Sequence, residues 1–473
     1  MGVKLFFVSA IFATVVVLLP PFASAADRGI TLDSRLGVAH VAGNYPDRHL
    51  EGDYLVWGGS KSYRLGFNSI EVFIPSNMCF GNNNTYQPYG PYQARDKYCE
   101  PKPSRWPLAQ SLKQFVEHSD FVTLFNLPIN RFYLTAYPLN LTFRQITENK
   151  VITGTPYTQA ELDSLTTEYY DFAKYLLETY RNNPKVFAVM PMVTMDRWLS
   201  GRDFSQDDSP GVCNPSDSAP QSRINNMIAY YSTIAKAIQQ ARIDSGASQS
   251  KVYLTCEVNS VICPMQIPAV KAAINSVVPV VGCDLVGYAS YELRSTAYKD
   301  PSTSANFIRQ TLDYMASQTP NHPDFGNKNI VYSEVGIMEQ KIPIEFTNWF
   351  VDTFIRTSLD WGMPHIQLWS LGSCATFNPG PTDQSNPNNC TGMWMFRPDG
   401  SPGILYSRLR SLYGSVPTTS SSTPTPSPSI SPKPGDLNGD GSVNLHDFNQ
   451  LITNFGNPYT ILDFNAIISN YGS

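Results

Sequence analysis

The sequence predicts an α/β fold, a (β/α)8 barrel of the TIM type, followed by a small all-α module at its C-terminal end. Two observations predict the barrel. Eight short apolar runs alternate with segments of helical periodicity, and eight parallel strands are the number that closes such a barrel. The main alternative, a doubly wound open sheet, would lead us to expect a Gly-rich phosphate loop after an early strand. The chain contains neither GxGxxG nor GxxxxGKS.

The predicted strands are short runs rich in Val, Ile, Leu, Tyr and Phe, and the predicted helices carry apolar residues at three- and four-residue spacings. The strands are expected at 36–42, 69–74, 132–137, 185–190, 252–256, 283–288, 330–333 and 365–369. The helices are expected at 54–65, 162–180, 224–238, 269–277, 307–316, 346–361 and 404–413. Polar, Pro-rich loops follow the second, fourth and eighth strands, on the face where barrels build their sites.

The N-terminal segment, residues 1–25, has the features of a secretory signal peptide. Lys4 precedes a long apolar run, and the small residues Ala23, Ser24 and Ala25 follow it as a cleavage site. No second stretch reaches the roughly 18 apolar residues that a membrane-spanning helix needs. We therefore expect a secreted, extracellular protein with no membrane association once the signal is removed.

The remaining chain divides into a barrel, residues 26–414, a linker, 415–434, and a C-terminal module, 435–473. Seventeen of the twenty linker residues are Pro, Ser or Thr, which leaves too few apolar groups to fold and keeps the segment extended. The formal net charge of the chain is -5, which counts against a nucleic-acid partner.

Eight cysteines in an exported chain predict disulfides. Cys79 with Cys99 and Cys374 with Cys390 each bracket a polar segment, so we expect these two local bridges. The pairing of the other four, Cys213, Cys256, Cys263 and Cys283, stays open. No CxxC pair occurs, so a zinc site is not expected.

The start of the C-terminal module has the spacing of a twelve-residue calcium loop. The predicted Ca2+ ligands, at positions 1, 3, 5, 7 and 12, are Asp436, Asn438, Asp440, Ser442 and Asp447. Gly441 permits the sharp turn at position 6, and Asn444 stands at position 9, where a water often intervenes. Oxygen ligands of this number suit Ca2+ better than Mg2+.

A repeat follows the loop, because residues 445–456 match residues 461–472 sixteen positions later. Together, the loop and the repeat resemble a type I dockerin, a calcium-dependent EF-hand-like module that docks on cohesin domains. The second repeat departs from that pattern, since 457–460 stands where a second loop would be and only Asp463 is retained. We therefore expect one calcium site and a cohesin-like partner; the barrel itself is expected to need no cofactor.

Glu334 ends the seventh predicted strand and is the first candidate for catalysis. A buried strand that delivers a carboxylate at its end, with a helix after it, is how a barrel presents a catalytic group. Retaining glycoside hydrolysis needs two carboxyl groups about 5 Å apart, one as nucleophile and one as acid/base. The barrel resembles the clan A retaining (β/α)8 glycoside hydrolases, whose nucleophile glutamate ends strand seven.

That resemblance implies Glu334 as the nucleophile, Trp369 at the end of strand eight as the aromatic floor of the sugar site, and Tyr288 or Tyr291 as a hydroxyl that hydrogen-bonds the nucleophile. The clan carries its acid/base glutamate at the end of strand four, and this chain has none there. Asp196 is the nearest carboxyl, beside Arg197, which would hold it ionised.

Glu257, at the end of strand five, is the rival acid/base candidate, because an apolar wall beside it would favour the protonated form that an acid requires. Both alternatives stay open at this stage. Further residues expected to bind substrate are Asn259, His40 and Trp198. No GxSxG elbow occurs.

The sequence thus predicts a secreted glycoside hydrolase that acts on a polysaccharide or oligosaccharide by a retaining two-carboxylate mechanism and is tethered through a dockerin-like tail. The missing strand-four glutamate keeps a second hypothesis open, a catalytically inactive carbohydrate-binding barrel docked to a scaffold. A third hypothesis, a scaffold-docked structural protein, would lack an aromatic-lined cleft.

Overall fold

The computed structural model describes residues 30–40, 54–74, 111–139, 147–200, 213, 218–372, 376–377, 390–397, 400–415, 434–437, 442–453 and 461–471. The chain forms two compact units, residues 1–417 and 418–473, and each is described by itself. The predicted signal peptide and most of the linker lie outside the described residues. So do Cys79, Cys99 and Cys374, and with them both expected local bridges.

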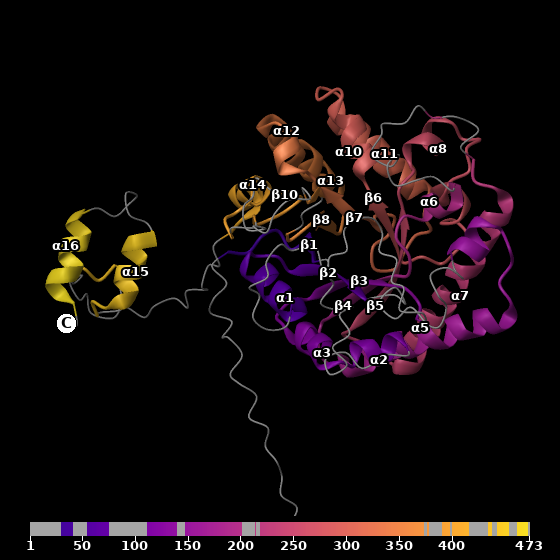
Figure 1. The fold of residues 1–473 in the computed structure, drawn as a ribbon, viewed down its shortest axis with the longest axis horizontal. Coiled ribbons are helices and arrows are strands. Elements are labelled where there is room, and N and C mark those ends of the chain that lie inside the picture. Colours follow the sequence, from indigo (N-terminus) through magenta and orange to yellow (C-terminus); the bar gives the residue numbers. More distant parts are fainter. Residues whose placement is uncertain are drawn as a thin grey trace, which may run out of the picture. The chain divides into compact units, whose positions relative to one another are not determined.

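The larger unit is a closed barrel of eight parallel strands in sequential order (Figure 1), as the sequence predicts. The strands are β1 Leu36–His40, β2 Ser69–Ile74, β3 Arg131–Ala136, β4 Val186–Met190, β5 Lys251–Val258, β6 Leu285–Ala289, β7 Ile330–Gly336 and β8 Ile366–Trp369. The barrel closes where β1 pairs with β8 through Leu36 and Ile366. Two short strands, β9 Thr376–Phe377 and β10 Cys390–Thr391, form a separate antiparallel pair.

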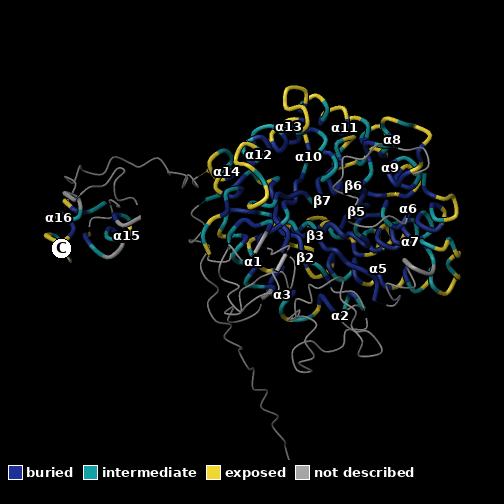
Figure 2. The backbone as a smooth tube through the Cα atoms, turned by 45° about the horizontal axis from the view of Figure 1, so that its top comes forward, coloured by how far each residue is buried: buried dark blue, intermediate teal, exposed yellow. Residues whose placement is uncertain are grey.

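Helices surround the barrel, and Figure 2 shows the buried strands inside with the exposed residues on the surrounding helices and loops. The helices are α1 Tyr54–Arg64, α2 Leu112–Val116, α3 Ser119–Asn126, α5 Gln159–Thr179, α6 Met195–Ser200, α7 Gln221–Ser245, α8 Ile262–Gln266, α9 Ala273–Ser276, α10 Tyr291–Tyr298, α11 Ser304–Gln318, α12 Ile344–Trp349, α13 Arg356–Trp361 and α14 Ile404–Tyr413. The described residues also include the π-helical turns η2 Thr147–Ile152 and η6 Phe350–Ile355 and the 3-10 turn η5 Glu339–Lys341.

The longest predicted helices are confirmed, and their apolar faces cover the barrel. α5 begins in a capping box, in which the Thr158 side chain accepts from the Glu161 backbone N–H and the Glu161 carboxylate accepts from that of Thr158. The expected helix at 269–277 is much shorter than predicted, since only Ala273–Ser276 is helical. The short helices α2, α3, α6, α8 and α10 carry too few turns for a periodic apolar pattern, and the sequence did not indicate them.

The barrel interior is filled in layers. An apolar layer at the amino ends of the strands consists of Tyr133, Ala188, Tyr253, Leu285 and Val331. Two positions further along β3, β5 and β7 the buried residues are polar, namely Thr135, Thr255 and Ser333, and Ser69 at the start of β2 and Gln367 in β8 are buried as well. Gly37 of β1 leaves room for the Gln367 side chain, because a Cβ at Gly37 would lie 2.2 Å from Gln367 Oε1. The Gln367 side-chain amide reaches across β1 and donates to the Ser69 hydroxyl at 3.3 Å.

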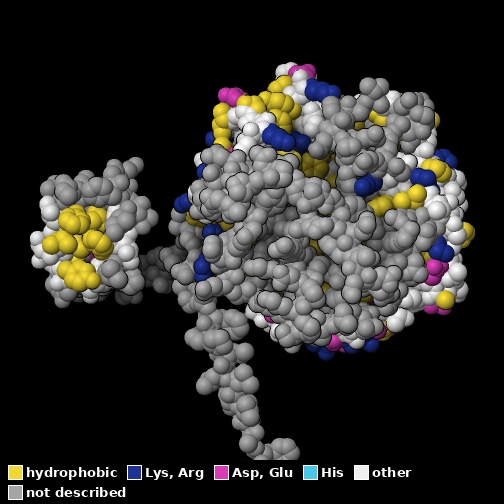
Figure 3. Space-filling model, viewed as in Figure 1, with side chains coloured by type: hydrophobic (Ala, Val, Ile, Leu, Met, Phe, Trp, Pro, Cys, Tyr) yellow, Lys and Arg dark blue, Asp and Glu magenta, His cyan; other side chains and the backbone are white. Residues whose placement is uncertain are grey.

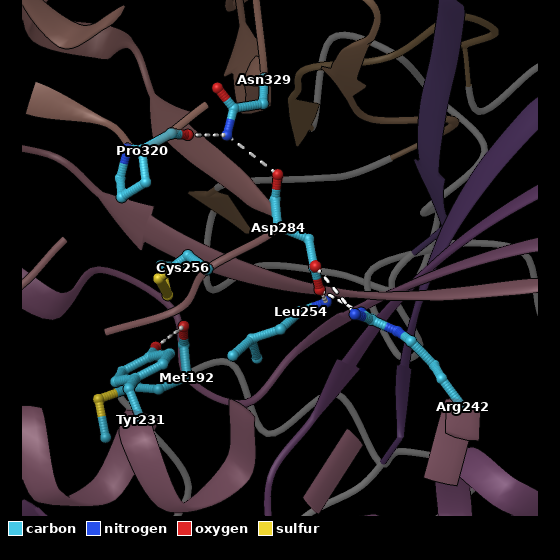
Figure 4. Close-up of a disulfide and its surroundings, with 9 residues drawn as sticks. Met192, Tyr231, Arg242, Leu254, Cys256, Asp284, Pro320 and Asn329 are labelled. Carbon is cyan, nitrogen blue, oxygen red and sulfur yellow. Dashed lines mark hydrogen bonds and ion pairs between the residues drawn. A yellow bond between two sulfur atoms is a disulfide. The ribbon is translucent and has the colours of Figure 1, made fainter. Parts of the chain in front are cut away.

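Two disulfides settle the pairing that the sequence leaves open: Cys213 with Cys263, and Cys256 with Cys283. Figure 4 shows the second bridge and, near it, Asp284. The Asp284 carboxylate pairs with Arg242, accepts the Leu254 backbone N–H at 2.7 Å, and lies 3.1 Å from His322 Nε2. These bonds fix the segment before β6, which is why that strand begins at Leu285 rather than at Cys283 as predicted.

The two ends of the barrel unit meet in a short antiparallel bridge. Thr31 N donates to Ser415 O at 2.9 Å, and Ser415 N donates to Thr31 O at 2.8 Å. The segment that precedes β1 and the residue that follows α14 by two positions are therefore hydrogen-bonded to each other.

The smaller unit contains two described helices, α15 Leu445–Thr453 and α16 Ile461–Asn470. They pack through a small core of Val443, Leu451 and Ile467. Figure 3 shows hydrophobic side chains gathered on the visible face of this unit, and Ile468 and Tyr471 are 59% and 57% exposed. Across the described residues of both units, no helix has the length and apolar character to cross a membrane.

Candidate active site

Glu334 lies near the carboxyl end of β7, where the strand departs from regular pairing on both sides. The register with β6 shifts between Gly287 and Ala289, and the register with β8 shifts between Tyr332 and Val335. A bulge of this kind re-aims a side chain. In β7 the Ser333 hydroxyl points into the barrel, where it contacts Glu257. The next residue, Glu334, is half-buried at the rim.

The Tyr291 hydroxyl donates a 2.8 Å hydrogen bond to Glu334 Oε1. Tyr291 opens α10, directly after β6, and the Arg294 guanidinium lies 5.0 Å from its ring centre. Tyr288, the alternative from the sequence, is fully buried in β6 and donates instead to Glu292 at 2.8 Å. Of the two tyrosines, Tyr291 is therefore the one in contact with Glu334.

Trp369 ends β8 and pairs with Gly336 of β7, two residues beyond Glu334. Its ring meets that of Phe73 edge to face at 6.0 Å. Gly336 allows the backbones of β7 and β8 to approach closely, because a Cβ at Gly336 would lie 2.1 Å from the Trp369 carbonyl oxygen. An aromatic pair from β2 and β8 therefore lies beside the strand that carries the candidate nucleophile.

Glu257 is fully buried near the end of β5, and both of its carboxylate oxygens accept hydrogen bonds. The Ser333 hydroxyl donates to Oε1 at 2.7 Å, and the Thr194 backbone N–H donates to Oε2. Thr194 has a φ of 52°, a left-handed conformation unusual for a β-branched residue. Since Ser333 directly precedes Glu334, the structure brings Glu257 into the same part of the barrel as the candidate nucleophile.

Asp196, the other acid/base candidate, is buried in α6 and binds backbone. Its Oδ2 accepts from the N–H groups of Asn259 at 2.9 Å and Ser260 at 3.0 Å, and its Oδ1 accepts from Ala273 at 2.6 Å. Three N–H donors stabilise the ionised form of a carboxylate. This arrangement joins α6 to the end of β5 and to the start of α9, and it suits a structural role better than proton donation.

The three other predicted substrate-binding residues are buried. His40 lies against α1, where its ring would clash with any Cβ on Gly58, and its ring centre is 6.5 Å from that of Trp57. Trp198 is 7% exposed, and its indole N–H donates to the Val193 carbonyl at 3.2 Å. Asn259 is 9% exposed, and its Oδ1 has no hydrogen-bond partner among the described residues.

Two buried glutamates near the site escaped the sequence reasoning. Glu71 lies in the middle of β2, 2% exposed. A charged residue inside an otherwise apolar strand, Ser69–Ile74, is the signal that would have found it. Glu292 lies in the first turn of α10, and it accepts from the N–H groups of Val261 and Ile262 and from the Tyr288 hydroxyl.

Burial raises the pKa of both carboxyl groups. The pKa of Glu71 lies well above its ordinary value because of burial and because of the nearby Glu334 and Glu257 carboxylates. Burial raises the pKa of Glu292 to about 7, against the lowering effect of its hydrogen bonds. Perturbed carboxyl groups gather at functional sites, although structural networks produce them too.

In the smaller unit, the structure describes three of the five predicted calcium ligands. Asp447 is buried, and its two oxygens accept from the backbone N–H groups of Leu437 and Asn444, each at 2.8 Å. Asp436 and Ser442 are described as well, whereas Asn438 and Asp440 lie outside the described residues. Among the residues that are described, no group of three or more His, Cys, Asp or Glu side chains is placed to hold a metal ion.

No family model and no curated protein matches this chain. Its fold is similar to those of several solved structures. A GH5_18 protein of Streptomyces cattleya in complex with Manb1-4GlcNAc is 13% identical, with 93% of this chain and 97% of that chain covered and a TM-score of 0.47. The exo-beta-1,4-mannosidase Op5Man5 from Opitutaceae bacterium strain TAV5 is 10% identical, with coverages of 81% and 60% and a TM-score of 0.43.

A third structure, the GH5 xyloglucan-specific endo-beta-1,4-glucanase XEG5A from a metagenomic library, is 12% identical, with coverages of 79% and 96% and a TM-score of 0.41. These neighbours are glycoside hydrolases with barrel folds. At these identities and TM-scores we derive no residue role or substrate from them.

Proposed function

We propose that this protein is a secreted glycoside hydrolase that cleaves a polysaccharide or oligosaccharide with retention of configuration, and that the C-terminal module tethers it to a cohesin-like partner. The observation that carries the proposal is the setting of Glu334. This carboxylate lies at the carboxyl end of the seventh strand of a closed eight-stranded barrel, hydrogen-bonded to Tyr291, with Trp369 on the adjacent strand.

In this proposal Glu334 attacks the anomeric carbon of the sugar and forms a glycosyl-enzyme intermediate, while the leaving oxygen takes a proton from the acid. Tyr291 fixes the attacking carboxylate through a hydrogen bond to Oε1. Trp369 and Phe73 offer aromatic surface on which a sugar ring can stack.

For the acid/base we propose Glu257 rather than Asp196. Glu257 is linked to the residue before the nucleophile through the Ser333 hydroxyl, whereas Asp196 is bound by three backbone N–H groups that oppose its protonation. After glycosylation, the same Glu257 would accept a proton from the water that hydrolyses the intermediate.

The test is hydrolysis of a panel of glycans by the full chain and by Glu334→Gln, Glu257→Gln and Asp196→Asn. We expect Glu334→Gln to lose at least about 10³-fold in kcat, because an amide cannot form the covalent intermediate. Azide is expected to restore activity to a small variant of Glu334, such as Glu334→Gly, with inversion of configuration. Unchanged activity in Glu334→Gln would rule out the proposed nucleophile.

One observation supports the alternative hypothesis, a catalytically inactive carbohydrate-binding barrel: Glu257 is fully buried and both of its carboxylate oxygens accept hydrogen bonds. A protein of that class would bind glycans by calorimetry and hydrolyse none of them. Retained glycan affinity in Glu334→Gln, together with no turnover by the wild type, would favour it.

A further inference from the structure

A third carboxyl group, that of Glu71, interacts electrostatically with Glu334 and Glu257, and neither the resemblance nor the proposed mechanism uses it. Glu71 pairs with Ala39 of β1 and with Tyr133 of β3, and the Tyr133 side chain belongs to the interior apolar layer. Paired residues of parallel strands point to the same side of the sheet. The Glu71 side chain is therefore directed into the barrel, where only 2% of the residue is exposed.

Glu71 is bound through only one of its two oxygens. The Thr135 hydroxyl donates to Oε1 at 3.0 Å, and Oε2 has no hydrogen-bond partner among the residues that the structure describes. A buried carboxylate with an unsatisfied oxygen is costly, because both desolvation and the missing donor oppose the charge. A buried carboxylic acid with a proton on that oxygen avoids the charge and gains a donor.

The groups around Glu71 favour the same protonation state. Glu334 is the charged group that acts most strongly on Glu71, and it repels a further negative charge there. Tyr133, the register partner of Glu71 on β3, stacks its ring on that of His365 at 4.6 Å. Burial holds the pKa of Tyr133 high and that of His365 low, so both rings stay neutral.

No cation offsets this repulsion within the described barrel interior. Arg131, at the start of β3, lowers the pKa of Tyr133 and of His365, and its guanidinium donates to the exposed Ser34 carbonyl at 3.0 Å. Gln367 Oε1, an acceptor in the same interior, also has no partner among the described residues.

We propose that Glu71 is a positioning residue of this site: a neutral carboxylic acid, buried below the rim, whose hydroxyl donates towards the Glu334 carboxylate and holds it ionised. The inference rests on the proposed function for its effect on turnover. Its core statement, that Glu71 carries a proton at neutral pH, does not depend on any activity.

The first experiment therefore needs no substrate. Thermal unfolding of the full chain is compared for wild type and Glu71→Gln between about pH 4.5 and about pH 8. The folded state binds the Glu71 proton more tightly than the unfolded state does, so its contribution to stability is full at low pH and falls as pH rises above the ordinary glutamate value. Glu71→Gln has no such proton, and its Tm relative to wild type is expected to rise with pH.

The matched control is Glu168→Gln, a buried glutamate outside the barrel interior whose Oε1 accepts from the N–H groups of Leu112 and Leu139. This variant is expected to show no gain in relative Tm with pH. Infrared spectroscopy at neutral pH gives a second readout, since the protonated carboxyl C=O band should lose intensity in Glu71→Gln and keep its intensity in Glu168→Gln. A Tm difference independent of pH, or an unchanged band, overturns the proposal.

The second experiment compares the acid limb of kcat/KM against pH for Glu71→Gln and Glu71→Leu. The acid limb reports the pKa of the Glu334 carboxyl group, which must be ionised to attack. Glu71→Gln keeps an N–H donor and is expected to keep the wild-type limb. Glu71→Leu removes the donor, so the limb should move up by about one pH unit. Equal limbs for the two variants, or a downward shift in Gln, overturn the role assigned to Glu71. If wild type hydrolyses no glycan, the proposed function fails, and the unfolding and infrared results still decide the protonation of Glu71.

Discussion

At the scale of single residues, the site is defined by which polar group each carboxylate meets. Glu334 accepts from a tyrosine hydroxyl, Glu257 from a serine hydroxyl and a backbone N–H, and Asp196 from three backbone N–H groups. Side-chain hydroxyls can reorient when charge moves, whereas a backbone N–H is fixed by the chain. The carboxylates bound by hydroxyls are therefore the ones suited to changes of charge during a reaction.

Tyr291→Phe is expected to lower kcat by about 10- to 100-fold, because a hydrogen bond to a charged group contributes about 1.5–3 kcal/mol. Steady-state kinetics on the substrate that the glycan panel identifies would measure it. Tyr288→Phe is the matched control, since its hydroxyl meets Glu292 and not Glu334. A larger loss of kcat in Tyr288→Phe than in Tyr291→Phe would contradict the assignment of Tyr291 to the nucleophile.

At the scale of elements, buried carboxylates also hold the loops at the carboxyl ends of the strands. Asp196 joins α6 to the segment after β5 and to α9, and Glu292 joins α10 to the start of α8. The short helices there have too few turns to be stable alone. They depend on these contacts, which is also why their sequences carry no periodic signal.

Asp196→Asn is expected to reduce the free energy of unfolding by roughly 2–4 kcal/mol, because one oxygen and the negative charge that serve buried N–H donors are lost. Denaturant unfolding would measure this change. Glu257→Gln is expected to lose activity instead, with a smaller effect on stability. The reverse pattern, an inactive but fully stable Asp196→Asn, would return Asp196 to the role of acid/base.

Glu292 predicts a pH dependence of stability. Its pKa in the folded protein, about 7, lies above the ordinary glutamate value. Its contribution is therefore full in acid and is lost as pH rises from about 4.5 to about 7, by roughly 1–3 kcal/mol. Urea unfolding at several pH values should show a flatter dependence in Glu292→Gln than in wild type, and parallel curves would contradict the prediction.

At the scale of the whole molecule, the strand sequences were sufficient to predict the barrel, because the buried strands are short and mostly apolar, as in Ile330–Tyr332. The position of Glu334 followed from strand order alone. The contacts that distinguish Tyr291 from Tyr288, or Glu257 from Asp196, depend on how loops fold over the rim. The one signal for Glu71 was a charge inside an apolar strand, and its interaction with Glu334 could not be predicted because the two residues lie far apart in the sequence.

Calcium binding remains a prediction for the smaller unit. Isothermal titration of the full chain with Ca2+ after removal of metal is expected to give one site per chain, lost in Asp440→Ala, because only the first repeat carries a complete set of oxygen ligands. Asp463→Ala is the control, from the repeat that lacks a loop. Two sites per chain, or binding that survives Asp440→Ala, would contradict it.

The bridge between Thr31 and Ser415 has a consequence for protein engineering. Because the two ends of the barrel unit are already hydrogen-bonded to each other, a short peptide can join them and the chain can be opened at another loop without stretching the fold. A circular permutant would then begin at any of the helices around the barrel. The accessory module could thus be placed beside a chosen loop, and the effect of its position on catalysis measured directly.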